Sequence, residues 1–251
     1  MPGLGMRAHW SPRIMFPVSG GDAGCFYDPS DLSTMFQDVA GTIPCAVDST
    51  VALIKDKGPF GYDASQSDSA LRPTLKKDSA TGRHFLRYGP EVQHLVTGLV
   101  IPRPTGDVFS AVAIQHISDT LDFPSYFRHR GFTNDIDSRL PVFFSQKSTG
   151  KMFVEFGSTG SVSFTTNRAL KNVFSCTRIV SGALTAYSNG SIAGVDNSVN
   201  NPTSDTLKET HVGVTANFDL YGALVISGFV NSTANRARIE KWFAERMGLV
   251  Y

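Results

Sequence analysis

The sequence predicts an all-β protein of the sandwich or barrel class, with an extended arm before the β domain and one helix after it. From residue 85 onward, short runs rich in β-branched and aromatic residues alternate with turn residues at the regular spacing of such folds. The first 24 residues show neither a helical nor a strand period. The last part of the chain, by contrast, has the apolar spacing of an amphipathic helix.

Residues 1–24 are predicted to form an extended arm. They contain three prolines and five glycines among scattered large apolar side chains. Such a stretch is too short and too proline-rich to build its own core, so we expect its large side chains to bury against a neighbouring subunit or a larger particle. The predicted partner-binding residues of the arm are Trp10, Ile14, Met15 and Phe16. The β domain is predicted to cover residues 25–251.

Strands are predicted wherever short runs favour extended structure and turn residues flank them. The dipeptide Asn189-Gly190 lies between two apolar runs and predicts a tight type I′ hairpin turn, because both central residues of that turn take positive φ. The other predicted strands cover residues 96–102, 108–117, 141–146, 151–157, 161–166, 210–218 and 221–230.

A helix is predicted over about residues 234–247, with Ser232 or Thr233 as its N-cap and Gly248 just past its C-terminal end. Its apolar side chains fall on one face and should bury against a sheet. They are Ile239, Trp242, Phe243 and Met247. Two pairs of opposite charge at i, i+4 spacing are predicted on the solvent side. They are Arg236 with Glu240, and Lys241 with Glu245.

Composition limits the kind of partner. At 251 residues with 41% apolar content, the chain can bury a substantial core. Its 23 Lys and Arg against 22 Asp and Glu give no strong field, so nucleic acid is not an expected partner. No apolar run reaches the ~18 residues of a membrane span and no signal-peptide core is visible, so we expect a chain that folds in a cytoplasm. Cys25, Cys45 and Cys176 are widely spaced and are expected to be free thiols.

The stretch YDPSDLSTMFQD, residues 27–38, carries three aspartates around a short apolar patch. A calcium loop places ligands at every second position and turns on a glycine, and both features are missing here. No other motif gathers metal ligands, so we expect no metal and no cofactor. A role for Asp28, Asp31 and Asp38 as ion ligands stays open as the alternative to a structural role.

The sequence lacks the motifs of common hydrolases. It contains no alternating acidic motif of the E-x-D-x-x-E kind, no G-x-S-x-G nucleophile turn and no H-E-x-x-H metal motif. Asp135 and Asp137 alternate, but they lie between Gly131 and Pro141 and are expected in a solvated loop. An enzyme is therefore not expected, and no catalytic residue is predicted.

The segment of residues 124–139 combines aromatic, basic, amide and carboxylate side chains. Aromatic faces beside such polar groups recognise sugars by stacking and hydrogen bonding, and the same set is enriched at protein interfaces. Both uses stay open for this segment. The predicted ligand-binding residues are Tyr126, Phe127, Arg128, Arg130, Phe132, Asn134, Asp135 and Asp137.

Several motifs along the chain resemble one family. In order they are YDPSDLSTMFQDVAGTIPC, LIKDKG, ASQSDSALRPTL, LTAYSNGSIAG, HVGV and YGALVISGFVNSTANRARIEKWFAERMGL. This order is similar to the concanavalin A-like (laminin-G-like) jelly-roll modules of bacteriophage virion proteins, and it covers about residues 25–251. The resemblance implies a two-sheet antiparallel jelly-roll sandwich closed by a C-terminal helix. Many relatives carry F-D-G-x-D-D where this chain has FLRYGPEVQHL, which lacks aspartate and argues against calcium there.

The resemblance also implies roles for the opening motif. Leu32, Met35 and Phe36 would close one end of the sandwich. The side chains expected to satisfy nearby backbone amides are Asp28, Ser30 and Asp31.

The resemblance fixes no single activity, because this fold hosts lectins, glycosidases and structural modules. The expected function is that of a virion structural protein, a tail, fibre or capsid decoration component that docks through its arm and displays a lectin-like jelly roll. The alternative is a receptor-binding lectin that recognises host surface glycans. The expected partners are other virion subunits in a homo-oligomer, and the expected location is the virion, after synthesis in the host cytoplasm.

Overall fold

The protein is an antiparallel β-sandwich with one C-terminal helix. Its computed structural model describes residues 10–17, 23–89, 93–99, 107–118, 125–130, 142–156, 160–179, 182–198, 209–214, 217–229 and 231–251. Every strand pairing in these ranges is antiparallel, and the strands form two sheets. The predicted two-sheet jelly-roll class is therefore confirmed.

Sheet A has eight strands in the described part of the chain, and β17 is at its centre. Its strand order is β15 (Ser191–Asp196), β14 (Leu184–Ser188), β13 (Lys171–Arg178), β8 (Val108–Ser118), β17 (Asn217–Ser227), β6 (His84–Tyr88) and β5 (Thr74–Lys77). The short strand β1 (Gly24–Tyr27) also pairs with β17, beyond the segment that β6 covers.

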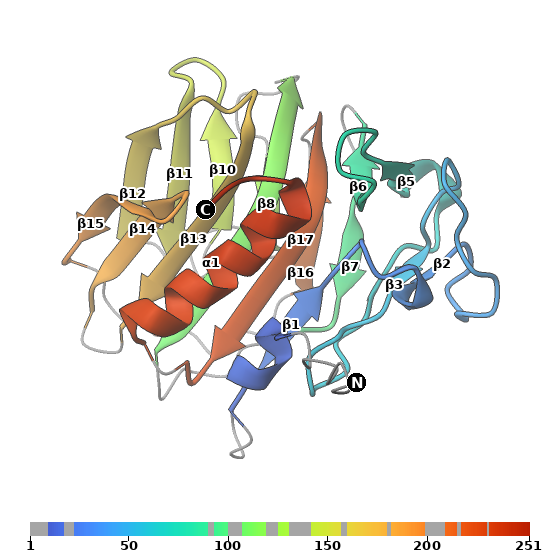
Figure 1. Ribbon diagram of the computed structural model, residues 1–251, viewed down its shortest axis with the longest axis horizontal. Helices are drawn as coiled ribbons and strands as arrows, with labels where there is room; N and C mark the ends of the chain where they lie inside the picture. The colour runs from blue at the N-terminus through green and yellow to red at the C-terminus, as the bar shows by residue number, and fades with distance from the viewer. Residues whose placement is uncertain are drawn as a thin grey trace, which may run out of the picture.

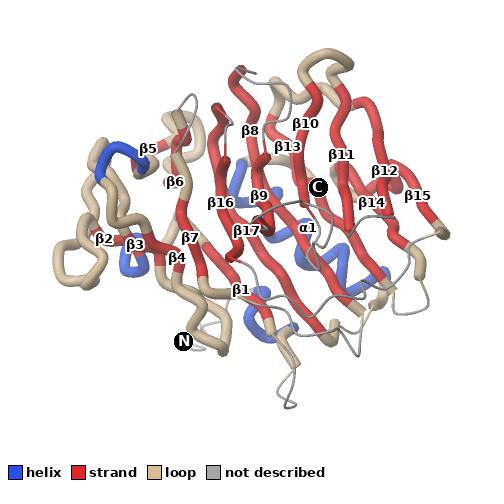
Figure 2. The backbone as a smooth tube through the Cα atoms, turned by 180° about the vertical axis from the view of Figure 1, so that it is seen from behind, coloured by secondary structure: helices blue, strands red, loops and turns tan. Residues whose placement is uncertain are grey.

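Sheet B has nine strands in the described ranges and lies behind sheet A in Figure 1; Figure 2 shows it from its own side. Its strand order is β12 (Gly160–Thr165), β11 (Lys151–Phe156), β10 (Val142–Gln146), β9 (Ser125–Arg130), β16 (Glu209–Val214), β7 (Leu95–Thr97), β4 (Ala64–Ser65), β3 (Leu53–Ile54) and β2 (Met35–Phe36).

Two hydrophobic clusters hold the layers together. The larger cluster fills the space between the sheets and takes alternate residues from strands such as β12, where Val162 and Phe164 are buried and their neighbours are exposed. The second cluster lies between sheet A and the helix. Strand β17 contributes to both clusters, so its residues are buried on both faces. This double burial explains why the sequence YGALVISGF runs apolar without alternating.

Helix α1 (Thr233–Met247) crosses sheet A in front of β13, β8 and β17 (Figure 1). The side chain of Ser232 accepts a hydrogen bond from the Asn235 amide at 3.1 Å and caps the N-terminus. Gly248 follows the last turn with φ of 73°, a left-handed conformation that glycine adopts without strain. The predicted apolar face is buried: its residues are Ile239, Trp242, Phe243 and Met247.

The hairpin between β14 and β15 has the predicted turn. Asn189 and Gly190 have φ of 48° and 85°, and Ser188 pairs with Ser191 across the turn. Two strand predictions need correction. Residues 210–218 do not form one strand, because β16 ends at Val214 in sheet B and β17 begins at Asn217 in sheet A. In the predicted run 96–102, strand β7 covers only Leu95–Thr97.

The described part of the arm packs against its own domain. It forms a one-turn 3₁₀ helix, η1 (Pro12–Met15), after which Phe16 is buried in the second cluster with 7% of its surface exposed. Trp10 and Met15 pack against the same cluster, whereas Ile14 is 65% exposed. The prediction that the arm's side chains bury against another subunit is therefore wrong for Phe16, which its own domain buries, and it stays a prediction for Trp10, Ile14 and Met15. Apolar side chains of β1 and α1 form the surface that the arm covers. The sequence does not reveal this surface, because the two elements come from opposite ends of the chain.

Candidate functional site

A pocket opens between the arm and helix α1. Four of its lining residues come from α1 at positions 238, 241, 242 and 245, which share one side of the helix because they are spaced by three and four residues. Trp10 of the arm forms the opposite wall. We call this cavity of about 310 Å³ the arm–helix pocket, and its lining residues are Trp10, Arg238, Lys241, Trp242 and Glu245.

Two indole rings, one buried and one half-buried, line this pocket. Trp242 is only 7% exposed, and its ring meets Phe26 and Phe243 edge-on, with both centroid distances at 5.2 Å. The Arg246 guanidinium lies 4.4 Å from the Trp242 ring centroid. Trp10 is half-buried, and the guanidinium of the exposed Arg238 lies 5.1 Å from its ring centroid. The site therefore has one wall fixed by the core and one wall supplied by the arm.

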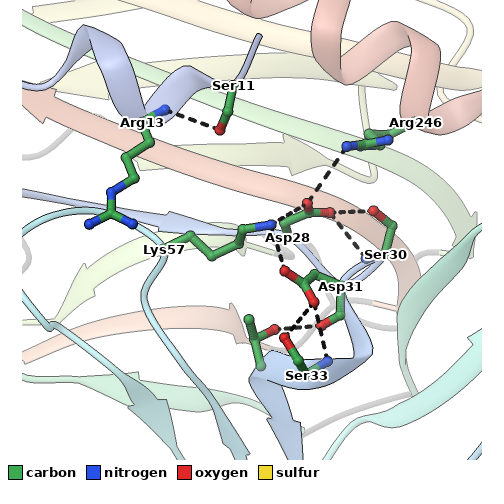
Figure 3. A network of polar contacts seen from close by, with 9 residues as sticks. Ser11, Arg13, Asp28, Ser30, Asp31, Ser33, Lys57 and Arg246 are labelled. Atoms are coloured by element: carbon green, nitrogen blue, oxygen red, sulfur yellow. Dashed lines mark hydrogen bonds and ion pairs between the residues drawn. The ribbon is translucent and has the colours of Figure 1, made fainter. Parts of the chain in front are cut away.

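A buried carboxylate supports the wall that contains Trp242. Asp28 is 1% exposed and accepts hydrogen bonds from the Ser30 amide at 3.1 Å and the Ser30 hydroxyl at 2.6 Å. Lys57 Nζ and Arg246 Nη2 approach the same carboxylate at 3.0 and 4.0 Å, and Figure 3 shows them arriving from different sides. Lys57 also pairs with Asp31 at 2.8 Å. We call these residues the Asp28 network.

Neighbouring charges in this network shift the pKa values of Lys57 and Asp31. Burial alone would lower the pKa of Lys57, but its hydrogen bonds and ion pairs with Asp31 and Asp28 raise that pKa above its ordinary value. Burial alone would raise the pKa of Asp31, and the hydrogen bonds from Lys57 and Ser33 lower it instead. Both shifts favour the charged forms that make the ion pair between Lys57 and Asp31.

The three aspartates of residues 27–38 have structural partners. The Asp31 side chain caps the 3₁₀ helix η2 (Leu32–Thr34) by accepting from the Ser33 amide. The Asp38 side chain accepts from the amides of Thr42 and Ile43 and closes its own loop. Among the described residues, no group of three or more histidine, cysteine or acidic side chains is arranged to hold a metal ion. The prediction that Asp28 and Asp31 satisfy backbone amides is confirmed, whereas the hydroxyl of Ser30, the third residue of that prediction, donates to the Asp28 side chain.

The apolar residues of the same motif differ in how deeply they are buried. Met35 is fully buried in the main core, as predicted, and Phe36 is half-buried. Leu32 is 41% exposed, so the prediction that it closes one end of the sandwich is wrong. The 3₁₀ turn of η2 directs it away from the core residues on either side.

The predicted ligand-binding segment places two aromatics in the core. Tyr126 and Phe127 are fully buried, and the Tyr126 hydroxyl donates to Ser145 Oγ at 2.9 Å. The prediction that these two rings stack on a ligand is wrong, because a shift in the β9–β10 register turns both inward. Arg128 and Arg130 lie on β9, in a part whose side chains are not described. The remaining predicted residues lie outside the described residues: Phe132, Asn134, Asp135 and Asp137.

Sequence reasoning missed the arm–helix pocket. The spacing of Arg238, Lys241 and Glu245 on one side of the helix was a visible signal. The opposing wall was not visible, because the arm shows no period that would indicate where Trp10 docks.

A second, larger cavity lies on the other flank of α1, near the chain's C-terminal residues. It measures about 840 Å³, and its lining residues are Gln115, Leu170, Lys171, Asn189, Gly190, Leu249, Val250 and Tyr251. Its polar side chains already have partners. Lys171 donates to Asp78 and to the Met247 carbonyl, and Asn189 is bonded to Val173 and Asn172. This cavity therefore offers mainly apolar contact.

The fold defines the class of protein: an antiparallel jelly-roll sandwich with a helix packed on one sheet. No protein-family model matches the chain, and no curated protein matches it. Solved structures do. The binding domain of botulinum neurotoxin serotype D superposes with a TM-score of 0.58 at 8% identity, over 92% of this chain and 53% of that chain. A botulinum neurotoxin type C structure gives 0.57 at 9% identity, over 76% of this chain and 48% of that chain.

A third similar structure is the sialidase of Trypanosoma rangeli, with a TM-score of 0.55 at 10% identity, over 94% of this chain and 36% of the sialidase. The chain thus spans between about a third and about half of the length of the structures it matches. At these identities the likeness is one of fold. None of the helices in the described part of the chain is long and apolar enough to cross a membrane.

Proposed function

We propose that this chain is a carbohydrate-binding jelly-roll module without catalytic activity, and that the arm–helix pocket receives the sugar. The observation that carries the proposal is the pairing of Trp10 and Trp242 in one pocket with the charged groups of Arg238, Lys241 and Glu245. Indole rings offer apolar faces to the C–H face of a sugar, and charged side chains at the rim hydrogen-bond its hydroxyls. The larger cavity is big enough for a sugar, but its Lys171 and Asn189 side chains already form hydrogen bonds within the protein.

The structural neighbours support the proposal at the level of the fold. The neurotoxin type C structure concerns a toxin that interacts with two ganglioside molecules. The serotype D ligand-binding domain was solved in complex with N-acetylneuraminic acid, and it matches this chain with a TM-score of 0.57. The sialidase is an enzyme, but a shared fold does not carry over an activity, and the sequence lacks the E-x-D-x-x-E motif expected of glycosidases on this scaffold.

The test is glycan binding by the purified chain and by two variants of the arm. The Trp10→Ala variant should lose binding on a glycan array and in titration calorimetry, because it removes the wall of the pocket that the arm supplies. Ile14→Ala, in the same arm but 65% exposed, should bind like the unaltered chain. The proposal fails if no glycan binds, or if Trp10→Ala binds as well as Ile14→Ala. Release of a fluorophore from a sialoside substrate would contradict the non-catalytic part.

The proposal includes a location: the module is displayed on a bacteriophage virion, as a tail, fibre or capsid decoration component among other virion subunits, where it would recognise host surface glycans. This part is supported by the sequence resemblance of residues 25–251. The structures compared above, from toxins and a sialidase, do not bear on it. Immunogold labelling of intact particles should place the protein on their surface, and labelling confined to infected-cell lysate would contradict this location.

A further inference from the structure

We infer that the sugar in the arm–helix pocket carries a carboxylate, and that Arg238 selects it; this inference rests on the proposed glycan-binding function. The chemical class is a terminal acidic sugar, either a sialic acid or a uronic acid. Both present a carboxylate on a pyranose ring, so the shared chemistry is a planar anion beside an apolar ring face.

The pocket lining has an excess of positive charge. Arg238 and Lys241 contribute two positive charges and Glu245 one negative charge, which leaves a net charge of +1. Lys241 and Glu245 lie 3.2 Å apart and compensate one another. Among the described residues, Arg238 has no carboxylate within ion-pair distance, so its charge is the one left for a ligand.

The surroundings do not cancel this charge. The nearby carboxylates of Asp28 and Asp31 are paired with Lys57 and Arg246. The Asp28 network therefore adds no net charge beside the pocket. A negatively charged ligand therefore meets a favourable potential in the pocket, whereas a cationic ligand meets a repulsive one.

Arg238 is also held in a suitable place. Its guanidinium lies over the Trp10 ring, which restricts its motion while its N–H groups keep no acceptor among the described residues. A guanidinium presents its N–H donors as a planar fork that matches the two oxygens of a carboxylate, and it is less strongly hydrated than an ammonium group. A neutral sugar would fill the same pocket but would offer this fork only hydroxyls, without a second charged oxygen in the same plane.

The size of the pocket limits the occupant. Its volume of about 310 Å³ is at the lower end for small-molecule pockets, which suits one or two sugar units at the end of a chain. The indoles of Trp10 and Trp242 form the walls that would contact the sugar ring, whereas Arg238 would bind its carboxylate.

The experiment compares affinities of the full chain for three probes: 3′-sialyllactose, a glucuronate-terminated disaccharide and neutral lactose. The acidic probe that fits should bind at least about tenfold more tightly than lactose, the effect of one charge-assisted bidentate pair. The preference should shrink as NaCl rises from about 50 to about 500 mM, because the pocket is open to screening ions. The two acidic probes distinguish sialic acid from uronic acid.

The decisive variant is Arg238→Gln. It should bring the acidic-to-neutral ratio to within about twofold, because the carboxylate loses its bidentate partner while both indoles, Lys241 and Glu245 remain. Arg83→Gln is the matched control, because it removes one positive charge from an exposed residue outside the pocket and should leave the ratio intact. Arg238 is exposed, so its replacement should not disturb folding, which circular dichroism would verify.

The outcomes separate this inference from the proposed function. If no probe and no arrayed glycan binds, the proposed function fails. If neutral and acidic sugars bind equally and Trp10→Ala abolishes both, the proposed function stands and the carboxylate inference is overturned. An acidic preference that survives in Arg238→Gln also overturns it, because another residue would then be the selector.

Discussion

The guanidinium of Arg236 and the carboxylate of Glu240 form an ion pair of 2.6 Å in the interior, between helix α1 and sheet A. Glu240 is fully buried and also accepts hydrogen bonds from the Tyr251 hydroxyl at 2.7 Å and from the Ser175 hydroxyl. Arg236 also lies over the Tyr187 ring and donates to the Gly190 carbonyl. The i, i+4 spacing was correctly predicted, but its placement on the solvent side was wrong: the pair joins the helix to the β14–β15 hairpin.

Removing Glu240 should destabilise the protein strongly. Glu240→Ala leaves the Arg236 guanidinium buried without its counter-charge, which costs about 3–5 kcal/mol of the free energy of unfolding. Glu245→Ala is the matched control on the same helix, because its partner Lys241 is 55% exposed and such pairs contribute under about 1 kcal/mol. Urea unfolding of both variants measures the difference. Similar losses in the two variants would contradict a buried pair.

The arm should contribute to stability through one side chain. Phe16→Ala removes a ring that is 7% exposed and packs edge-on to Phe60 with centroids 6.1 Å apart. We expect a loss of about 2–4 kcal/mol, near the lower part of the range for buried phenylalanines. Ile14→Ala, in the same arm, should cost under about 0.5 kcal/mol. Thermal melting of both variants compares them, and an unchanged melting temperature for Phe16→Ala would mean that the arm does not dock in solution.

The hairpin glycine Gly190 should resist substitution for two reasons. Its φ of 85° is strained for any side chain, and an added Cβ would lie 2.3 Å from the Tyr251 hydroxyl. Gly150 has a similar φ of 68° but open space around it. Gly150→Ala should therefore show the backbone strain alone, about 1–2 kcal/mol, and Gly190→Ala a larger loss. Repeating Gly190→Ala in a Tyr251→Ala background should remove the excess; if it persists, the clash with Tyr251 is not its cause.

Asp78 should make the protein sensitive to acid. Burial alone would raise its pKa, but hydrogen bonds from Lys171 and from the amides of Thr81 and Ala80 lower it to about 2, from 3.8. A carboxyl whose pKa is depressed by folding stabilises the folded state above its unfolded pKa, and that contribution disappears as the pH falls from about 4 toward 2. Unfolding free energies of the unaltered chain and of Asp78→Asn should differ most at pH 7 and converge near pH 2.

The convergence isolates Asp78 from other acids, because Asp31, Asp38 and Asp196 also have lowered pKa values and act on both proteins alike. A difference between the two proteins that stays constant down to pH 2 would contradict the role of the Lys171 pair.

Local chemistry explains which features the sequence predicted well. The turn at Asn189-Gly190 and the ends of α1 at Ser232 and Gly248 depend on the conformational preferences of a few adjacent residues, and these were correct. The burial of Tyr126 and Glu240 depends instead on which distant element covers them. The same holds for Trp10, whose partner Arg238 lies at the other end of the chain. Such long-range contacts leave no period in the sequence.

The position of β17 also has a consequence for how the chain reaches its fold. This late strand lies between β8 on one side and β6 and β1 on the other, and Gly24 pairs with Ile226 across most of the chain. Contacts between residues so far apart must close long loops before they stabilise anything, which makes folding slow. Until residues 217–227 leave the ribosome, the central position of sheet A is vacant and the edges of β8 and β6 are unpaired. We therefore expect the nascent chain to expose the apolar strands of sheet A until β17 is made, a state that is prone to aggregation.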